Sequence, residues 1–520
     1  MSIDLEAGTP VLVVGAGIMG AGIAQVAAQA GHTVRLFDAR EGAAAAACAK
    51  LEQALEGLVA KGKLDEEKAK ATVARIRAVD RLDDAAGAGL VVEAIIENAE
   101  AKRALFRELE AKVDARCVLA SNTSSISVTA LANGLKAPGR FVGMHFFNPV
   151  PLMKLVEVIS GLQTRPECAA AVFELARAWG KVPVHARSTP GFIVNRIARP
   201  YYAETLALLQ EQAAAPHELD ACLRAAGFRM GPCELMDLIG HDTNYAVTQS
   251  VYEANHFDKR FVPSIVQREL VDGGLLGRKS GRGFYRYPEG APALAARSLP
   301  TPVLTGSVEV HGRGPVADWL AAAVNRAAGR DVPRRPDSDW TGLAIDGAIL
   351  ALTDGRTASD LAAGHGCDVA MFDRFEVAAH AKARALAYAV CEGAASGWPD
   401  QAAAWLAAFG FLPVPVLDVP GLVVARTLAM LINEAADAVA QGVCSAEGAD
   451  AAMKLGVNYP RGPFEWLAEW GETPASAAAA VVQLLDALDA HCRGERYRAS
   501  AWLRRRASVA DRQARTRKGS

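Results

Sequence analysis

Residues 11–38 constrain this chain more than any other stretch, because they combine a short apolar run, a glycine-rich turn, a helical pattern and a second apolar run. The turn reads GAGIMG, and the second run ends on Asp38. In such a unit Gly15 allows the tight turn, Gly17 lets the backbone approach a pyrophosphate, and Gly20 lets the helix pack on the strand. The pyrophosphate would bind the N–H groups at the helix N-terminus. The pattern predicts a dinucleotide-binding βαβ unit.

The acid at the end of this unit indicates which dinucleotide it binds. Asp38 lies 18 residues beyond Gly20, where it can accept hydrogen bonds from a ribose 2′-hydroxyl and repel a 2′-phosphate. We therefore expect NAD as the cofactor, in preference to NADP. Arg40 is the side chain that would meet a 2′-phosphate if Asp38 were removed.

Composition excludes several classes of protein. A length of 520 residues predicts three or four domains, and a net charge of −2 argues against nucleic-acid binding by the whole chain. The nine cysteines include no CxxC pair, so we expect neither a zinc site nor a disulfide framework. The first apolar run is the predicted strand itself, so we expect no signal peptide. Charges interrupt the apolar run 421–440, which excludes a membrane span there. We expect a cytoplasmic protein.

The first third of the chain alternates strand and helix patterns. Residues 91–96, 117–120 and 141–144 are typical of buried strands, and residues 100–113 are typical of a helix. The alternation over residues 10–184 predicts a doubly wound α/β domain with a largely parallel sheet.

A helical region follows and is then repeated. After residues 189–191 the strand signals vanish, and helical patterns dominate as far as residues 283–285. The string PGFIVNR, which begins at Pro190, recurs 230 residues later as PGLVVAR, which begins at Pro420. Further matches at this spacing include Asp220 with Asp450. The spacing predicts a duplicated helical domain.

Between the two copies lies a degenerate version of the first domain. Residues 307–317 mimic a strand, a GxGxxA turn and a helix, with Pro315 inside the turn. Residues 348–352 give a second strand-like run, but no clear strand ending in an acid follows the turn at the required distance. We interpret this stretch as a decayed nucleotide-type α/β module.

These patterns give a fold class of α/β plus all-α. We expect five parts along the chain: an NAD-binding Rossmann domain (1–188), a helical domain (189–290), a degenerate α/β module (291–418), a second helical copy (419–500) and a basic tail (501–520).

Polar residues cluster where predicted strands of the first domain end. Glu97, the serine-rich string SNTSS at residues 121–125, and His145 each follow such a strand. Ligands bind at the carboxyl ends of strands in open α/β sheets, so we expect these residues to converge beside the nicotinamide. On its own the serine turn would be a helix N-cap, and a lone histidine would be structural.

Glu157 strengthens this interpretation. Alternation along residues 153–159 places it on the same strand face as Met153, Leu155 and Ile159. A carboxylate on a buried apolar face must be paired or protonated. We expect His145 to be its partner, because a carboxylate behind an imidazole fixes the tautomer and stabilises the imidazolium. The alternative is that this face is exposed to solvent.

The sequence resembles the L-3-hydroxyacyl-CoA dehydrogenase family. The resemblance covers residues 10–287 and rests on the strings GAGIMGAGIA, SNTSS, HFFNPV, MKLVEV, TPGFIVNR and GRKSGRGFY. The length and the second helical domain resemble the longer bacterial enzymes of phenylacetate catabolism and short-chain fatty acid β-oxidation. Their substrates are 3-hydroxyadipyl-CoA and 3-hydroxybutyryl-CoA.

The resemblance also implies roles for individual residues. It makes His145 the catalytic base and Glu157 its partner, while Ser124 and Asn195 hydrogen-bond the reacting oxygen of the substrate. Four further residues are implied to hold the cofactor: Glu97, Lys102, Asn148 and Lys279. Lys61 matches a lysine that contacts CoA, whereas the companion serine of the family is Ala54 here.

Two other functions remain open at this point. One is an NAD-dependent dehydrogenase of a small free hydroxyacid, of the gulonate type, although that family has a single helical domain. The other is a non-enzymatic protein on a dehydrogenase scaffold, which would have to lose the reactive residues. The favoured reading implies an acyl-CoA substrate, no nucleic-acid or membrane partner, and a homodimer or two helical copies that pack within one chain.

The second copy is expected to be structural. Ala425 stands where the first copy has Asn195, and no histidine between residues 307 and 420 lies in an HFFNP-like string. We expect one active site per chain. An apolar face on the second copy should pack on the first copy across a pseudo-twofold axis; it comprises Leu428, Leu431, Ile432, Ala435 and Val439. The basic tail is expected to be solvated and partly disordered.

Overall fold

A computed structural model describes residues 5–295, 298–300, 306–377 and 384–518. The chain forms two compact units. The first comprises Met1–Arg196 and Gln441–Val457, and the second comprises Ile197–Ala440 and Asn458–Ser520. A short piece of the second helical copy therefore belongs to the unit that carries the glycine-rich turn.

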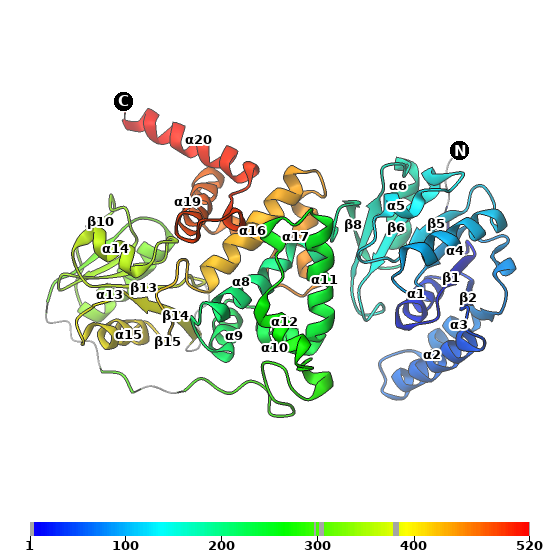
Figure 1. Cartoon of the computed structure of the whole chain (residues 1–520), viewed down its shortest axis with the longest axis horizontal. Helices are drawn as coiled ribbons and strands as arrows, with labels where there is room; N and C mark the ends of the chain where they lie inside the picture. The colour runs from blue at the N-terminus through cyan, green and yellow to red at the C-terminus, as the bar shows by residue number, and fades with distance from the viewer. Residues whose placement is uncertain (1–4, 296–297, 301–305, 378–383, 519–520) are drawn as a thin grey trace. The chain divides into compact units, whose positions relative to one another are not determined.

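The first unit is built on an eight-stranded sheet with the order β3-β2-β1-β4-β5-β6-β7-β8 (Figure 1). Neighbouring strands are parallel except β6 and β7, which are antiparallel. The strands are β1 (Val11–Val14), β2 (Val34–Phe37), β3 (Ile76–Val79), β4 (Leu90–Glu93), β5 (Val118–Ser121), β6 (Phe141–Phe146), β7 (Leu155–Ser160) and β8 (Val182–Arg187).

Helices cover both faces of this sheet. Residues of α1 and α6, such as Ile23 and Val172, share one apolar core with the strands. On the other face Phe106 of α4 packs edge-on against Phe141 of β6. The helices of the unit are α1 (Ile18–Gln29), α2 (Ala43–Ala60), α3 (Glu66–Ala74), η1 (Leu82–Ala85), α4 (Ala99–Lys112), α5 (Val128–Ala132), η2 (Pro138–Arg140), α6 (Pro166–Ala178), α7 (Val194–Ile197) and α17 (Ala446–Gly456).

The prediction of a doubly wound sheet is confirmed, with the largest shifts at the ends of β4 and β6. β4 ends at Glu93, three residues earlier than the apolar pattern suggests. β6 continues to Phe146, so His145 lies within this strand and does not follow it. The extension arises because β7 pairs antiparallel with β6 and continues the ladder past Met144.

The second unit combines the helices of both copies with a second sheet. The helices of the first copy are α8 (Arg199–Gln210), α9 (Pro216–Ala225), α10 (Pro232–Ile239), α11 (His241–Ala254), η3 (Lys259–Phe261), α12 (Ile265–Asp272) and η4 (Arg278–Ser280). The helices of the second copy in this unit are α16 (Val424–Ala440), α18 (Pro463–Ala468), α19 (Pro474–Cys492), η5 (Glu495–Tyr497) and α20 (Ala501–Lys518).

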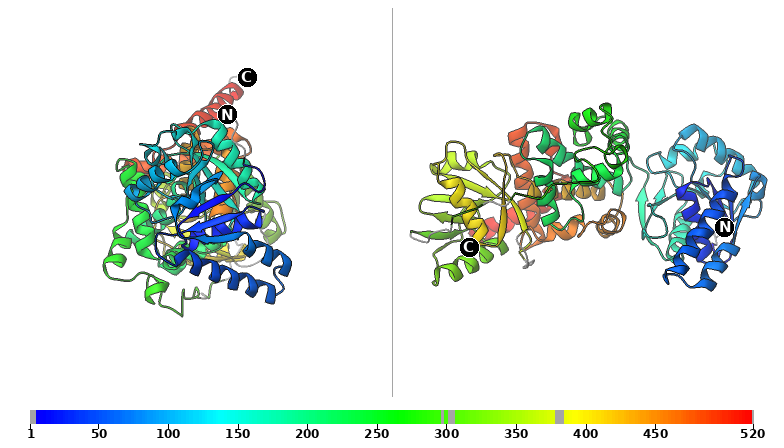
Figure 2. Two further views of the ribbon diagram at one scale, coloured as in Figure 1. Left: turned by 90° about the vertical axis from the view of Figure 1, so that its right-hand side faces the viewer. Right: turned by 90° about the horizontal axis from the view of Figure 1, so that it is seen from below.

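The second sheet has seven strands in the order β10-β9-β11-β12-β13-β14-β15, drawn in green and yellow in Figure 2. Its elements are β9 (Val308–His311), α13 (Pro315–Ala328), β10 (Arg334–Arg335), β11 (Gly342–Ile345), β12 (Ala348–Leu352), α14 (Ala358–His365), β13 (Val369–Phe372), β14 (Arg384–Val390), α15 (Trp398–Ala408) and β15 (Phe411–Pro415). β11 is antiparallel to both of its neighbours, so the nucleotide-type pattern is reduced, as the sequence predicts.

The backbone repeats itself at the predicted spacing of 230 residues. Phe192 and Leu422, which are equivalent, both have left-handed φ angles, of 48° and 51°. The N–H of Leu417, at the end of β15, donates to the Ala213 carbonyl of the first copy. The equivalent bond in the first unit runs from Arg187 to the Val443 carbonyl of the second copy. Each sheet is therefore tied to a turn of the other half's helical domain.

Helix packing follows the same pattern, in which each sheet contacts the helical copy from the other half of the chain. In the second unit α9, from the first copy, packs against β14. In the first unit α17, from the second copy, packs against β7 and β8. The two equivalent helices α8 and α16 also pack on each other, and the buried Arg426 of α16 pairs with the buried Glu204 of α8 at 2.8 Å.

The prediction that the basic tail is solvated and partly disordered is wrong in part. Residues 501–518 form the helix α20, which packs on α19 and α16. Leu503 and Ala507 are buried in this contact, and Arg504 pairs with Asp486 of α19 at 2.5 Å. The sequence analysis gave weight to the many arginines and missed the apolar residues four positions apart on one face of a helix.

No helix in the described part of the chain is long and apolar enough to cross a membrane. The same residues hold no cluster of three or more side chains suited to a metal ion. All nine cysteines are free thiols.

Candidate active site

The glycine-rich turn leaves an open space beside the start of α1. A Cβ on Gly15 would lie 2.4 Å from the Ala94 carbonyl oxygen, and a Cβ on Gly20 would lie 1.7 Å from the Gly15 oxygen. Internal packing therefore demands glycine at both positions. A Cβ on Gly17 would meet nothing within 4 Å. The protein itself gives no reason for glycine there, whereas close approach by a ligand's pyrophosphate does.

Asp38 lies at the tip of β2, next to this turn. Its carboxylate accepts hydrogen bonds from the backbone N–H groups of Ala16, at 2.8 Å, and Arg40, at 3.0 Å. Burial alone would raise the pKa of Asp38, but these hydrogen bonds and the Arg40 guanidinium bring the pKa below its usual value. The carboxylate is therefore ionised at neutral pH and remains an acceptor for ribose hydroxyls.

Glu97 fixes the serine-rich turn after β5. One of its oxygens accepts hydrogen bonds from the hydroxyl of Thr123, at 2.6 Å, and from the N–H groups of Ser124 and Ser125, at 2.9 and 3.1 Å. The other oxygen lies 3.2 Å from the ammonium of Lys102. Burial opposes ionisation of Glu97, but Lys102 and these donors together lower its pKa.

Lys102 itself is buried, with 1% of its surface exposed. Its ammonium also lies 2.5 Å from Glu93, a buried carboxylate at the end of β4 that accepts from Ser121 at 2.7 Å. Any effect of Lys102 on a cofactor must therefore pass through these two carboxylates. The sequence analysis missed Glu93, although a carboxylate at the end of an apolar strand was the available signal.

His145 and Glu157 form a buried pair. They are direct partners in the ladder between β6 and β7. The Nδ1 of His145 lies 2.6 Å from the Oε2 of Glu157. Only 6% of His145 and none of Glu157 is exposed, so the alternative that this face is open to solvent is excluded. Because ionised Glu157 only accepts hydrogen bonds, Nδ1 carries the proton and Nε2 is left as an acceptor.

The second oxygen of Glu157 binds the start of α7. Its Oε1 accepts hydrogen bonds from the N–H groups of Ile193 and Val194, both at 3.0 Å. The positive end of a helix stabilises a carboxylate at this place. The next residue is Asn195, and its side-chain Nδ2 lies 3.4 Å from the backbone carbonyl oxygen of Ser124. Glu157 thus links His145 to Asn195 and the serine turn.

Other predicted residues lie outside this cluster. Asn148 is exposed after β6, and Lys61 is exposed at the end of α2. Lys279 belongs to the second unit, where its ammonium lies 2.5 Å from Asp242. The sequence analysis also missed Asn122, whose side chain accepts from the Phe146 N–H at 2.9 Å and so joins the serine turn to β6.

The second sheet has lost the corresponding reactive groups. The ladder places Asp373, which follows β13, opposite Ala387 of β14, where the first sheet has His145 opposite Glu157. The Asp373 carboxylate accepts hydrogen bonds from the N–H groups of Val424 and Ala425. It thus makes the contact with a helix start that Glu157 makes in the first half. Burial raises its pKa to about 6. The carboxylate–helix contact survives here without an imidazole.

The glycine turn of the second sheet is also altered. A cavity of about 730 Å³ lies at this end of the sheet and is lined by Gly312, Gly314 and Asp354, among others. Pro315 is the first residue of α13 and has no N–H group to offer a phosphate. Asp354 occupies the position that Ser124 has in the first half. This edge therefore has a cavity but lacks counterparts of Ser124 and of the His145–Glu157 pair.

Three family models match most of the chain. They are 3-hydroxyacyl-CoA dehydrogenase, NAD binding domain, at residues 10–189; 3-hydroxyacyl-CoA dehydrogenase, C-terminal domain, at 191–287 and again at 421–520; and 3-hydroxybutyryl-CoA dehydrogenase reduced Rossmann-fold domain, at 350–420. The double match of the second model confirms the duplication, and the third confirms the degenerate module.

Individual relatives agree with these matches. The chain is 42% identical to 3-hydroxyadipyl-CoA dehydrogenase from Escherichia coli over 96% of its own length and 97% of that protein. It is 44% identical to a probable 3-hydroxybutyryl-CoA dehydrogenase from Deinococcus radiodurans, and this match covers 53% of the present chain and 99% of the relative. A crystal structure of 3-hydroxybutyryl-CoA dehydrogenase from Escherichia coli superposes with a TM-score of 0.86, at 41% identity, and covers 97% of this chain and 99% of that one.

Asp38 should determine the choice of cofactor. We expect the unmodified protein to use NAD. Asp38→Ser should reduce the preference for NAD over NADP by about 10- to 100-fold, because one or two hydrogen bonds between the ribose and a charged group are lost. The measurement is kcat/KM for each cofactor. Adding Arg40→Ala to Asp38→Ser should remove the gain in NADP use, because Arg40 would meet the 2′-phosphate. Equal use of both cofactors by the unmodified protein would contradict the assignment.

Proposed function

Since the chain belongs to the 3-hydroxyacyl-CoA dehydrogenase family, we propose that its first half oxidises the 3-hydroxyl of a short L-3-hydroxyacyl-CoA, with His145 as the base. The observation that supports this most is the buried pair of His145 with Glu157, which leaves one imidazole nitrogen free to take a proton. The NAD-dependent oxidoreductase class follows from the family; the roles of the residues and the acyl group are the proposal.

The first unit fits NAD at the glycine turn. The open space at Gly17 leaves room for the pyrophosphate, and the N-terminus of α1 offers it N–H donors. The ionised Asp38 is an acceptor for the ribose hydroxyls. We propose that Asn148 and Lys279 also hold the cofactor, and that Glu97 does so with the support of Lys102. When bound, NAD accepts a hydride at its nicotinamide ring.

The residues around His145 divide the remaining work. The Nε2 of His145 removes the proton of the C3-hydroxyl as C3 loses its hydride. Glu157 holds the ring in the required tautomer and stabilises the imidazolium that forms. Ser124 and Asn195 donate hydrogen bonds to the C3 oxygen and polarise the ketone in the reverse direction. Lys61 is proposed to contact the CoA moiety.

The acyl group is proposed to be 3-hydroxyadipyl or 3-hydroxybutyryl, the two that are named among full-length relatives. The first would place the enzyme in phenylacetate catabolism and the second in short-chain β-oxidation. A cytoplasmic location fits both, because the nine free thiols suit a reducing compartment. The two alternatives from the sequence are not retained: the family models cover both helical copies, and the reactive residues are present.

His145→Gln should lower kcat by about 10²- to 10⁴-fold, the usual range for loss of a general base. The dissociation constant of NADH should stay within about twofold, since the His145 ring contacts Glu157, Phe147 and Phe192, which lie outside the glycine-rich turn. A matched control is His185→Gln, because His185 is exposed on β8 and stacks only on Phe173 among aromatic rings. Near-normal kcat in His145→Gln would refute the proposed role.

The substrate assay uses NADH formation with 3-hydroxybutyryl-CoA, 3-hydroxyadipyl-CoA and longer 3-hydroxyacyl-CoA thioesters. We expect kcat/KM to be highest for one of the first two. A maximum at long chains, or activity on free hydroxyacids alone, would contradict the proposed substrate class.

One active site per chain is a further expectation, because the second sheet offers Asp373 and Pro315 where the first offers His145 and a free helix N-terminus. Calorimetric titration with NADH alone, in which no turnover takes place, should therefore give a stoichiometry near one. Two equivalents per chain would show that the second half also binds the cofactor.

A further inference from the structure

We propose that residues 441–457, which belong to the second helical copy, are a positioning element for the active site of the first half. This inference rests on the proposed roles of His145 and Glu157. The segment is part of the first compact unit, where α17 packs against β7 and β8. β7 carries Glu157, so the second copy reaches the strand behind the proposed base.

Gly456, at the end of α17, is the closest point of this contact. A Cβ there would lie 2.7 Å from Leu155, 3.0 Å from Val194 and 3.6 Å from Phe147. Each of these neighbours is adjacent to the pair: Leu155 lies two residues before Glu157, Val194 donates to Glu157, and the Phe147 ring lies 4.5 Å from the His145 ring. A Cβ at position 456 would therefore press on the side chains of Leu155 and Val194, and a larger side chain would also reach Phe147.

Gln441 acts at the other end of the segment. Its side-chain oxygen accepts a hydrogen bond from Arg196 at 2.8 Å. Arg196 is buried and directly follows Asn195 on α7. The contact therefore fixes the short helix whose N-terminus binds Glu157 and whose Asn195 is proposed to bind the substrate oxygen.

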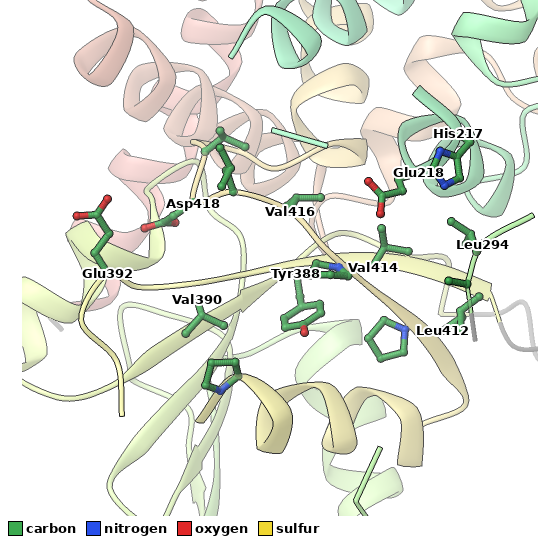
Figure 3. Close-up of a pocket in the computed structure, with 16 residues that line it drawn as sticks. His217, Glu218, Leu294, Tyr388, Val390, Glu392, Leu412, Val414, Val416 and Asp418 are labelled. Atoms are coloured by element: carbon green, nitrogen blue, oxygen red, sulfur yellow. The ribbon is translucent and has the colours of Figure 1, made fainter. Parts of the chain in front are cut away.

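The equivalent contact in the second half has different residues. In the first unit Gly448 lets α17 approach β8, and a Cβ there would lie 2.9 Å from Val184. At the equivalent place in the second unit stands Glu218 of α9, opposite Val414 of β15. Figure 3 shows Glu218 and Val414 beside a cavity of about 700 Å³. The contact in the first unit therefore has a glycine at this position and the contact in the second unit a glutamate, although α9 still packs against β14 there.

The cysteine of the segment agrees with this placement. Burial raises the pKa of Cys444 to about 12, with a further contribution from the negative charge of Glu157 and an opposing one from Arg196. Cys444 is therefore a neutral thiol close enough to Glu157 to feel its charge. It provides no ion partner for Glu157, so the contacts that carry the proposed role are the packing of Gly456 and the Gln441–Arg196 bond.

The test replaces Gly456 by Ala and by Val in the full chain. We expect a graded loss of kcat, reaching about 10- to 100-fold for Gly456→Val, because misplacement of a catalytic group by about 1 Å has effects of this size. The pH profile of kcat should shift as well, since Glu157 no longer holds the imidazole in place. The dissociation constant of NADH should change by less than about twofold.

A matched control is Gly364→Val in α14, where a new Cβ meets nothing within 4 Å. This variant should keep both kcat and its pH profile. If Gly456→Val does not fold, Gln441→Ala decides the question. It removes one hydrogen-bond acceptor at an exposed residue and should lower kcat severalfold, with partial recovery in Gln441→Glu, which restores an acceptor for Arg196.

A folded Gly456→Val with unchanged kcat and pH profile would overturn the inference, as would Gln441→Ala with unchanged kcat where Gly456→Val does not fold. His145→Gln in the same assay separates this failure from failure of the proposed function. If His145→Gln is inactive while the Gly456 and Gln441 variants are normal, the base is correct and the positioning role is wrong. If His145→Gln is active, the proposed function itself fails.

Discussion

The first half of this protein depends on where one buried carboxylate places its two oxygens. Glu157 directs one oxygen to His145 and the other to the first N–H groups of α7. Fully buried charges are stable only when such partners are present. The same contacts fix the imidazole tautomer, the start of the helix and, through Asn195, the approach to the serine turn. Stability and chemistry therefore share one set of hydrogen bonds.

The second half shows what the carboxylate contributes to folding alone. Asp373 keeps the contact with a helix N-terminus, but it does so from the strand position that His145 occupies in the first half, opposite Ala387. A duplicated fold can thus keep the contact between a carboxylate and a helix N-terminus while it loses the imidazole partner. The two similar sheets of this chain differ in this way: the first has a His145–Glu157 pair and the second has Asp373 opposite Ala387.

Much of this arrangement could be predicted from the sequence, because glycine spacing and strand alternation are local signals. The βαβ turn and the pairing of Glu157 with His145 follow from short-range patterns, and the repeat follows from strings that recur at one fixed spacing. The exchange of α9 and α17 between sheets does not, since it depends on which surfaces of two similar domains meet. The Glu93–Lys102 pair was missed for another reason: its two residues lie on β4 and on α4, and their contact depends on how the loop between these elements places the helix.

The central claim is that Glu157 holds His145 as a base with its proton on Nδ1. The most direct test is ¹⁵N NMR of histidine-labelled protein, with the His145 signals assigned by their loss in His145→Gln. At pH values where the ring is neutral, the account predicts a protonated Nδ1 and an unprotonated Nε2, and a loss of this preference in Glu157→Gln. A neutral ring protonated on Nε2 in the unmodified protein would contradict the account.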